Sequence, residues 1–68
     1  MKSVSGKPFC TLLECHGWLL SRIQSSHHIY LKPGNPAAIS VPVHGNQALK
    51  IGLLKHFMKV ARLTEDDL

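Results

Sequence analysis

Two segments with helical periodicity stand near the two ends of this chain and leave room for only a short stretch between them. In each segment apolar residues recur at the i, i+3, i+4, i+7 spacing of a helix with one buried stripe. The stripes consist of Phe9, Leu12, Leu13 and His16 in the first segment, and of Leu54, Phe57, Met58 and Ala61 in the second. We therefore predict helices over residues 6–16, ended by Gly17, and over residues 50–61.

The residues between these helices predict three short strands. Residues 18–24 and 27–32 contain Trp, Ile, Tyr and Leu, and the two-residue polar connection between them favours an antiparallel hairpin. The turn cluster at residues 33–36 precedes residues 39–43, where apolar and polar residues alternate. Pro42 cannot donate to a neighbouring strand, so the third strand lies at a sheet edge or turns Pro42 out of the pairing.

This order of elements predicts a single α+β domain, over residues 1–68, with the order α-β-β-β-α. We expect a three-stranded antiparallel sheet with both helices on one face, closing a small core. The double-stranded-RNA-binding domain has the same order of elements, although order alone says little about activity. After the second helix, Thr64 and Asp67 have the spacing of a capped final turn.

The charge of the chain is basic. Eight Lys and Arg residues stand against four Asp and Glu, for a net charge of +4. Three of the acids, Glu65, Asp66 and Asp67, lie in the last four residues, which leaves Glu14 as the one acid before them. This indicates either a solvated basic surface or attraction to a polyanion. It also argues against catalysis by paired carboxylates and against a metal site built from carboxylates.

The remaining composition indicates a cytoplasmic protein. No apolar run approaches the roughly 18 residues of a membrane span, and no apolar signal segment follows the N-terminus, so we expect no membrane association. Cys10 and Cys15 would fall on different faces of a helix, which makes a disulfide between them implausible. They are expected to be reduced thiols.

Five histidines are the residues most able to carry chemistry: His16, His27, His28, His44 and His56. Imidazole can give or take a proton near neutral pH. RNA carries its own nucleophile, the 2′-hydroxyl. A ribonuclease therefore needs only a base, a proton donor for the leaving 5′-oxygen and positive charge near the phosphate, without a metal or other cofactor.

Each histidine also has a structural interpretation. His16 suits the C-terminus of the first helix, and His56 suits the exposed side of the second. His27 and His28 are adjacent in a strand and so point to opposite faces. His44 fits either role. The histidines and cysteines lack a recognisable zinc-ligand spacing, and we predict no metal site.

The basic residues are candidates for RNA binding. Lys55, Lys59 and Arg62 have the i, i+4, i+7 spacing of one helix face, which is either a solvated face or a phosphate-binding stripe. Lys50 is expected near the start of the second helix, whose free N–H groups favour phosphate. Arg22 is a further candidate.

From end to end the sequence resembles the HicA (YcfA-like) toxin family. The stretches that carry the resemblance are Ser5-Gly6-Lys7, Gly17-Trp18, Ser26-His27-His28-Ile29-Tyr30, Lys32-Pro33-Gly34, Val41-Pro42-Val43-His44-Gly45-Asn46, Leu49-Lys50 and Gly52-Leu53-Leu54. Their order and spacing over nearly all 68 residues make the match specific.

The resemblance implies an mRNA interferase, which is the toxin of a type II toxin–antitoxin pair. It implies that His27 is catalytic, with Ser26 and His28 beside it at the RNA, and that a HicB-type antitoxin covers the active surface. Three positions depart from the family pattern. Pro8 lies in the first helix, at a position where its cost is small. Ser25 stands where the family usually has Gly, and Ile51 where Pro is frequent.

Three functions are therefore compatible with the sequence. The first is a metal-independent endoribonuclease with His27 as general base or acid and with mRNA bound by the candidates above. The second is an RNA-binding module of the same fold with weak or no catalysis, for which Ser25 argues. The third is a protein-interaction subunit whose only partner is an antitoxin-like chain.

Overall fold

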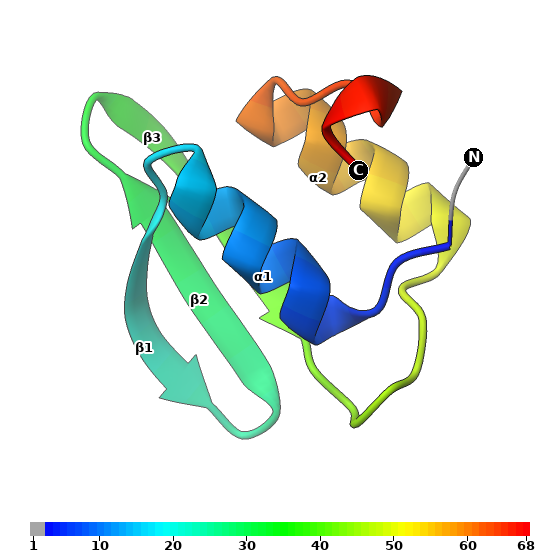
Figure 1. Cartoon of the computed structure of the whole chain (residues 1–68). Helices are drawn as coiled ribbons and strands as arrows, with labels where there is room; N and C mark the ends of the chain where they lie inside the picture. The colour runs from blue at the N-terminus through cyan, green and yellow to red at the C-terminus, as the bar shows by residue number, and fades with distance from the viewer. Residues whose placement is uncertain (1–2) are drawn as a thin grey trace.

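The computed structural model describes residues 3–68, which form two helices and three strands in the predicted order (Figure 1). The elements are α1 (Gly6–Cys15), β1 (Leu19–Gln24), β2 (His27–Lys32), β3 (Asn35–Pro42), α2 (Ile51–Ala61) and a final 3-10 turn, Glu65–Asp67. The predicted α+β fold is confirmed. The first two residues of the predicted domain lie outside the described residues.

The sheet has the order β1-β2-β3, with both neighbouring pairs antiparallel. Because successive side chains of a strand alternate between faces, Tyr30 points toward the helices and is buried, whereas Leu31 points to the uncovered face and is exposed. His27 has the same parity as Leu31, and His28 has that of Tyr30. A register shift between Leu20 and Arg22 marks a bulge in β1.

The third strand is longer than predicted. It begins at Asn35, not Ile39, and only Pro33 and Gly34 form the turn before it. Asn35 pairs with Lys32, and its Oδ1 accepts the Ala37 N–H at 2.9 Å. Pro36 is tolerated here because β3 is an edge strand and the register shifts at this point. The same edge position accommodates Pro42, as predicted.

The boundary between α1 and β1 also differs slightly from the prediction. Gly17 adopts a φ of 91°, the left-handed conformation expected after a helix. The Trp18 N–H donates to the carbonyl of Leu13 at 3.0 Å, so it completes the end of α1. Trp18 therefore precedes β1, and its side chain is buried in the core.

The core lies between the sheet and the two helices. Seven of its residues are at most 1% exposed: Phe9, Leu13, Trp18, Tyr30, Ile39, Val41 and Leu54. The rings of Phe9 and Phe57 stack with their centroids 5.8 Å apart, which joins α1 to α2. Full burial of each large apolar side chain stabilises a fold by about 1.5–3 kcal/mol.

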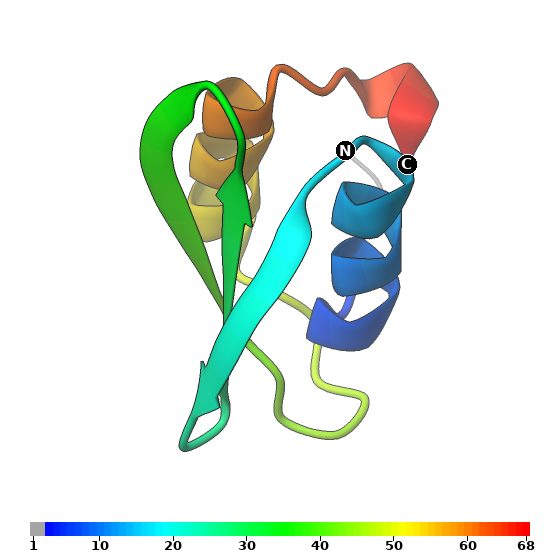
Figure 2. The same cartoon turned by 90° about the vertical axis from the view of Figure 1, so that its left-hand side faces the viewer.

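Both helices run in the same general direction, so their N-termini lie at one end of the molecule (Figure 2). The β1–β2 turn and the loop of residues 43–50 lie at this same end, which we call the histidine end. The Leu49 N–H donates to the carbonyl of Val4 at 2.8 Å, tying the approach to α2 to the approach to α1. The β2–β3 turn and the helix C-termini mark the opposite end.

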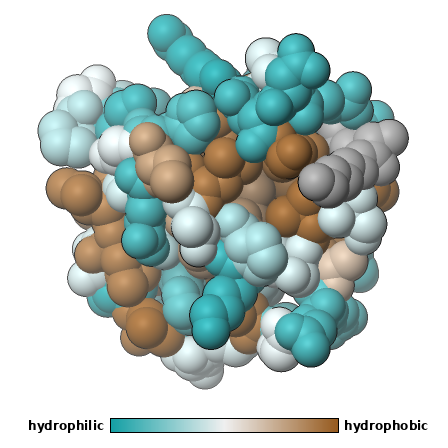
Figure 3. All heavy atoms as spheres, in the orientation of Figure 1, coloured by the Kyte–Doolittle hydropathy of each residue, from teal (hydrophilic) through white to brown (hydrophobic). Residues whose placement is uncertain are grey.

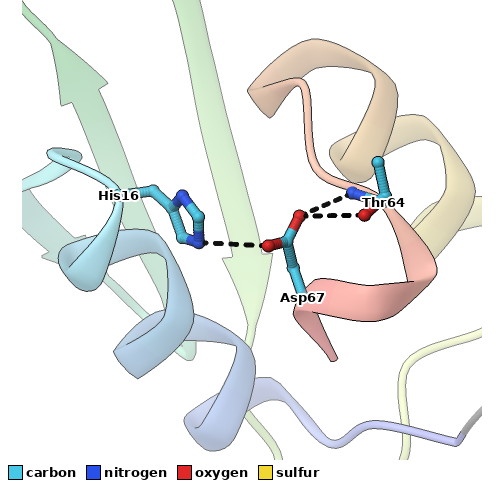
Figure 4. A network of polar contacts seen from close by, with 3 residues as sticks. All are labelled: His16, Thr64 and Asp67. Atoms are coloured by element: carbon cyan, nitrogen blue, oxygen red, sulfur yellow. Dashed lines mark hydrogen bonds and ion pairs between the residues drawn. The ribbon is translucent and has the colours of Figure 1, made fainter.

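At the opposite end, the final turn is attached to α1 through a polar network (Figure 4). The Thr64 N–H donates to Asp67 Oδ2 at 2.8 Å, which confirms the predicted capped turn. His16 Nε2 lies 3.8 Å from Asp67 Oδ1. The Thr64 N–H, and to a smaller extent His16, hold the pKa of Asp67 below its usual value. No helix within residues 3–68 has the length and apolar character needed to cross a membrane.

Candidate active site

His27 is the first residue of β2 and lies exposed at the histidine end of the sheet. Its Cα partners are Gln24 in β1 and Pro42 in β3, so the start of the middle strand is held from both sides. The carbonyl of the preceding Ser26 accepts the Val43 N–H at 2.8 Å. The backbone around His27 is therefore fixed, while its imidazole faces solvent.

The structure brings His44 next to His27. The two ring centroids are 6.5 Å apart, and the ring planes meet at 81°. His44 follows β3 by two residues and is exposed, like His27. The sequence left the role of His44 open. The register of β2 and β3 would have indicated that His44 lies near His27, because His27 pairs with Pro42 and His44 follows Pro42 by two positions.

A shallow pocket of about 420 Å³ continues from His44 toward α2. Pro42, His44, Lys50 and Leu53 are among the residues that line it. Lys50 is the N-cap of α2 and makes no side-chain hydrogen bond to the helix, so its ammonium is available to a ligand. The first N–H groups of a helix have no partners within the helix and carry partial positive charge. Lys50 and this helix start together favour an anion.

Two more predicted residues lie near His27. Arg22 is exposed and pairs with Ile29, which has the same parity along β2 as His27, so Arg22 lies on the uncovered face with His27. Ser26 is half-buried in the β1–β2 turn, directly before His27.

Ser25, the other residue of this turn, has a φ of 57°. This is the left-handed conformation that Gly adopts most readily, which explains why the resembled family usually has Gly at this position. The substitution by Ser keeps the geometry of the turn beside His27 at a cost in backbone strain.

Four predicted RNA-binding residues are not brought together with His27. His28 is half-buried on the helix-covered side of the sheet. Lys55 and Lys59 are exposed on α2. Arg62 lies beyond the end of α2 in a left-handed conformation, so the predicted helical stripe stops at Lys59.

Arg62 lies at the opposite end of the molecule from His27. It lines a separate pocket together with His16, Lys32 and the β2–β3 turn. Twelve positions at about 1.5 Å each put it roughly 18 Å along the helix axis from Lys50. Arg62 therefore belongs to a different basic surface from that of Lys50.

Side chains at the histidine end can transfer protons and neutralise negative charge. His27 and His44 supply imidazoles, and Lys50 and Arg22 supply fixed positive charges. Within residues 3–68, no group of three or more His, Cys, Asp or Glu side chains is arranged to hold a metal ion. The acidic residue nearest in sequence to these groups, Glu14, instead accepts a hydrogen bond from Tyr30.

The uncovered face of the sheet also carries apolar side chains. Leu19 is 60% exposed and Leu31, its Cα partner across the β1–β2 pair, is 44% exposed. Figure 3 shows hydrophobic residues reaching the surface on the side where the sheet lies in Figure 1. A monomer gains little from exposing such side chains, so this face is suited to contact with another protein.

Comparison with known proteins identifies one family. The model of the HicA toxin of bacterial toxin–antitoxin systems matches residues 6–63, a span that begins with α1 and ends just after α2. All candidate site residues fall inside this span. No curated protein matches the chain significantly.

Proposed function

The chain belongs to the HicA toxin family, and we propose that it is an endoribonuclease that cleaves mRNA by histidine acid–base catalysis. The observation that carries the proposal is the exposed His27, held at the head of the middle strand on the same end of the molecule as His44 and Lys50. A buried His27, or one at the end opposite Lys50, would have argued against it.

The reaction needs little from the protein because RNA supplies the nucleophile. His27 acts as a general base or acid on the 2′-hydroxyl or the 5′-oxygen, a role that contributes typically about 10²–10⁴-fold to a rate. Positive charge from Lys50 and Arg22 stabilises the additional negative charge that develops on the phosphate in the transition state. No metal or other cofactor enters this scheme.

RNA binding would rely mainly on phosphate contacts. Lys50 lines the pocket with His44, Arg22 lies on the same face of the sheet as His27, and Ser26 offers a hydroxyl in the adjoining turn. Lys55 and Lys59 are exposed further along α2, Arg62 lies at the opposite end and His28 points to the other face of the sheet, so these four are secondary candidates. Phosphate contacts carry no sequence information, so we expect broad specificity and strong dependence on salt.

The direct test is cleavage of an end-labelled RNA by purified wild-type protein and by His27→Ala. We expect His27→Ala to lose at least about 10²-fold in rate while its circular dichroism spectrum and RNA affinity stay close to wild type. His56→Ala is the matched control, because His56 is also exposed but lies on α2. Undiminished cleavage by His27→Ala would remove His27 from the mechanism.

A toxin of this family works with an antitoxin. We propose that the antitoxin is a HicB-type protein and that it binds the face of the sheet opposite the two helices. A protein seated there would contact Leu19 and Leu31 and at the same time block His27, which lies on the same face. Leu19→Lys should therefore weaken antitoxin binding more than Leu20→Lys, whose side chain has the opposite parity in β1. The cytoplasm is the expected location, since mRNA is found there.

A second candidate function is RNA binding with weak or no catalysis, and Ser25 is the observation that favours it. The left-handed φ of 57° is strained for Ser, and the strain lies two residues before His27. Under this alternative the protein binds RNA in a salt-dependent manner, and the cleavage assay yields no products from the wild type over long incubation.

A further inference from the structure

We propose that His44 is the second proton-transfer group of the ribonuclease, so that His27 and His44 act as an acid–base pair on one phosphodiester. This inference rests on the proposed function and goes beyond it, because a single histidine would leave one of the two proton transfers to solvent. It is carried by the position of His44 and by the way in which the backbone holds it there.

The separation of the two rings suits one phosphate. Proton transfer requires each imidazole to come within about 2.6–3.2 Å of the oxygen on which it acts. With the ring centroids 6.5 Å apart, both imidazoles lie close enough for each to contact a different oxygen of one phosphodiester. The 81° angle between the ring planes presents an edge of one ring to the face of the other, so the rings are not stacked and remain open to a ligand.

Hydrogen bonds hold the backbone of His44 on both sides. Before it, the Val43 N–H donates to the carbonyl of Ser26, the residue directly before His27. After it, the carbonyl of His44 accepts the Gln47 N–H at 3.0 Å. Shifts of His44 relative to His27 are therefore restricted, which is what a fixed acid–base pair requires.

A purely structural role does not explain His44. Its side chain is exposed and contributes nothing to the buried core. The pocket that it lines with Lys50 places a positive charge nearby, where the phosphate would lie. Exposed imidazole beside a second imidazole and a cation is suited to chemistry on an anion.

The proposed step balances as a transesterification. One imidazole, in its neutral form, takes the proton of the 2′-hydroxyl while the 2′-oxygen forms a bond to phosphorus. The other, in its protonated form, gives its proton to the 5′-oxygen as the bond between phosphorus and that oxygen breaks. The products are a 2′,3′-cyclic phosphate and a free 5′-hydroxyl, and the two imidazoles end with their protonation states exchanged.

The test compares two RNA substrates that differ in one atom. In the second substrate sulfur replaces the 5′-oxygen at the cleavable bond, and a thiolate leaves without receiving a proton. Wild type, His27→Ala, His44→Ala, His44→Gln and the control His56→Ala are assayed on both. On the oxygen substrate we expect both His27→Ala and His44→Ala to lose about 10²–10⁴-fold.

On the sulfur substrate the variant that lacks the general acid should regain a rate within about tenfold of wild type, whereas the variant that lacks the base should stay slow. Restoration of one variant but not the other supports the pair and assigns the two roles. A wild-type rate for His44→Ala and His44→Gln on the oxygen substrate would overturn the proposed role of His44 and leave the ribonuclease and the role of His27 standing. Equal behaviour of the His27 and His44 variants on both substrates would also overturn it. Failure of the wild type to cleave either substrate would instead overturn the ribonuclease itself.

Discussion

The hydroxyl of Tyr30 donates a 2.6 Å hydrogen bond to Glu14 Oε2 and thereby links the centre of the sheet to α1. Tyr30 is 1% exposed, and Glu14 is the one acidic residue of the chain before the C-terminal tail. This acid, which the sequence left without a role, is therefore the partner of the buried phenol.

We expect Tyr30→Phe to lower the free energy of unfolding by about 1 kcal/mol, because the ring stays packed and one hydrogen bond is lost. The freed carboxylate of Glu14 is exposed and can be solvated by water, which limits the loss. Urea denaturation measures the effect. Glu14→Gln, which keeps an acceptor oxygen, should cost less than Tyr30→Phe, and the reverse order would contradict the assigned bond.

Stability should decrease at alkaline pH because of two buried groups, the Tyr30 phenol and the Cys10 thiol. Burial raises the pKa of both Tyr30 and Cys10, and the hydrogen bond to Glu14 raises that of Tyr30 further. The folded state therefore favours the neutral forms, whose stabilising contribution is complete below the ordinary values of about 8.5–10. It is lost as the pH rises through the folded-state values.

Urea denaturation between about pH 7 and pH 10.5 measures this decrease. Cys10→Ala should reduce the alkaline slope, although it also lowers stability at neutral pH by removing a buried side chain. Cys15→Ala, at an exposed thiol, should leave the slope close to wild type. Equal slopes for the Cys10 and Cys15 variants would refute a contribution from the buried thiol.

Gly6→Ala should destabilise the protein even though Ala is the better helix former by about 1 kcal/mol. A Cβ atom at Gly6 would collide with the backbone carbonyl oxygen of Pro42, which belongs to the end of β3. Overpacking of this kind costs typically about 1–3 kcal/mol. Gly52→Ala is the matched control, because a Cβ there meets open space, and it should raise the melting temperature.

Ser25→Gly should stabilise the β1–β2 turn. Removing the Cβ relieves a left-handed conformation that costs about 1–2 kcal/mol for an ordinary residue, and the greater freedom of unfolded Gly offsets about 0.5–1 kcal/mol of that gain. Thermal unfolding should show a modest rise in melting temperature. Ser26→Gly should not give this rise, because Ser26 has no positive φ. Equal effects of the two substitutions would refute the strain argument.

RNA affinity should separate the two basic surfaces. Lys50→Ala should weaken binding and reduce the slope of log affinity against log salt by about 0.7, the value for one phosphate contact on a single strand. Arg62→Ala should change the slope less, because Arg62 lines the pocket at the opposite end. Filter binding at several salt concentrations measures both slopes, and a larger change for Arg62→Ala would place the RNA at that end.

Much of this structure could be predicted from the sequence because it depends on neighbours along the chain. The stripe that contains Phe9 and Leu13, the hairpin at Ser25-Ser26 and the capped turn at Thr64 are set by local periodicity and turn chemistry. His27 was singled out by its resemblance to a family motif. The length of β3 was underestimated because Pro36 indicates a turn unless the strand is known to lie at an edge.

The site itself was decided by the tertiary structure. His27 and His44 are 17 positions apart, and only the β2–β3 register and the course of the following loop bring their rings together. Arg62 has the spacing of a helical stripe, but the helix ends before it and places it at the other end of the molecule. Periodicity determines which residues share a face of one element, whereas packing between elements determines which residues of different elements meet.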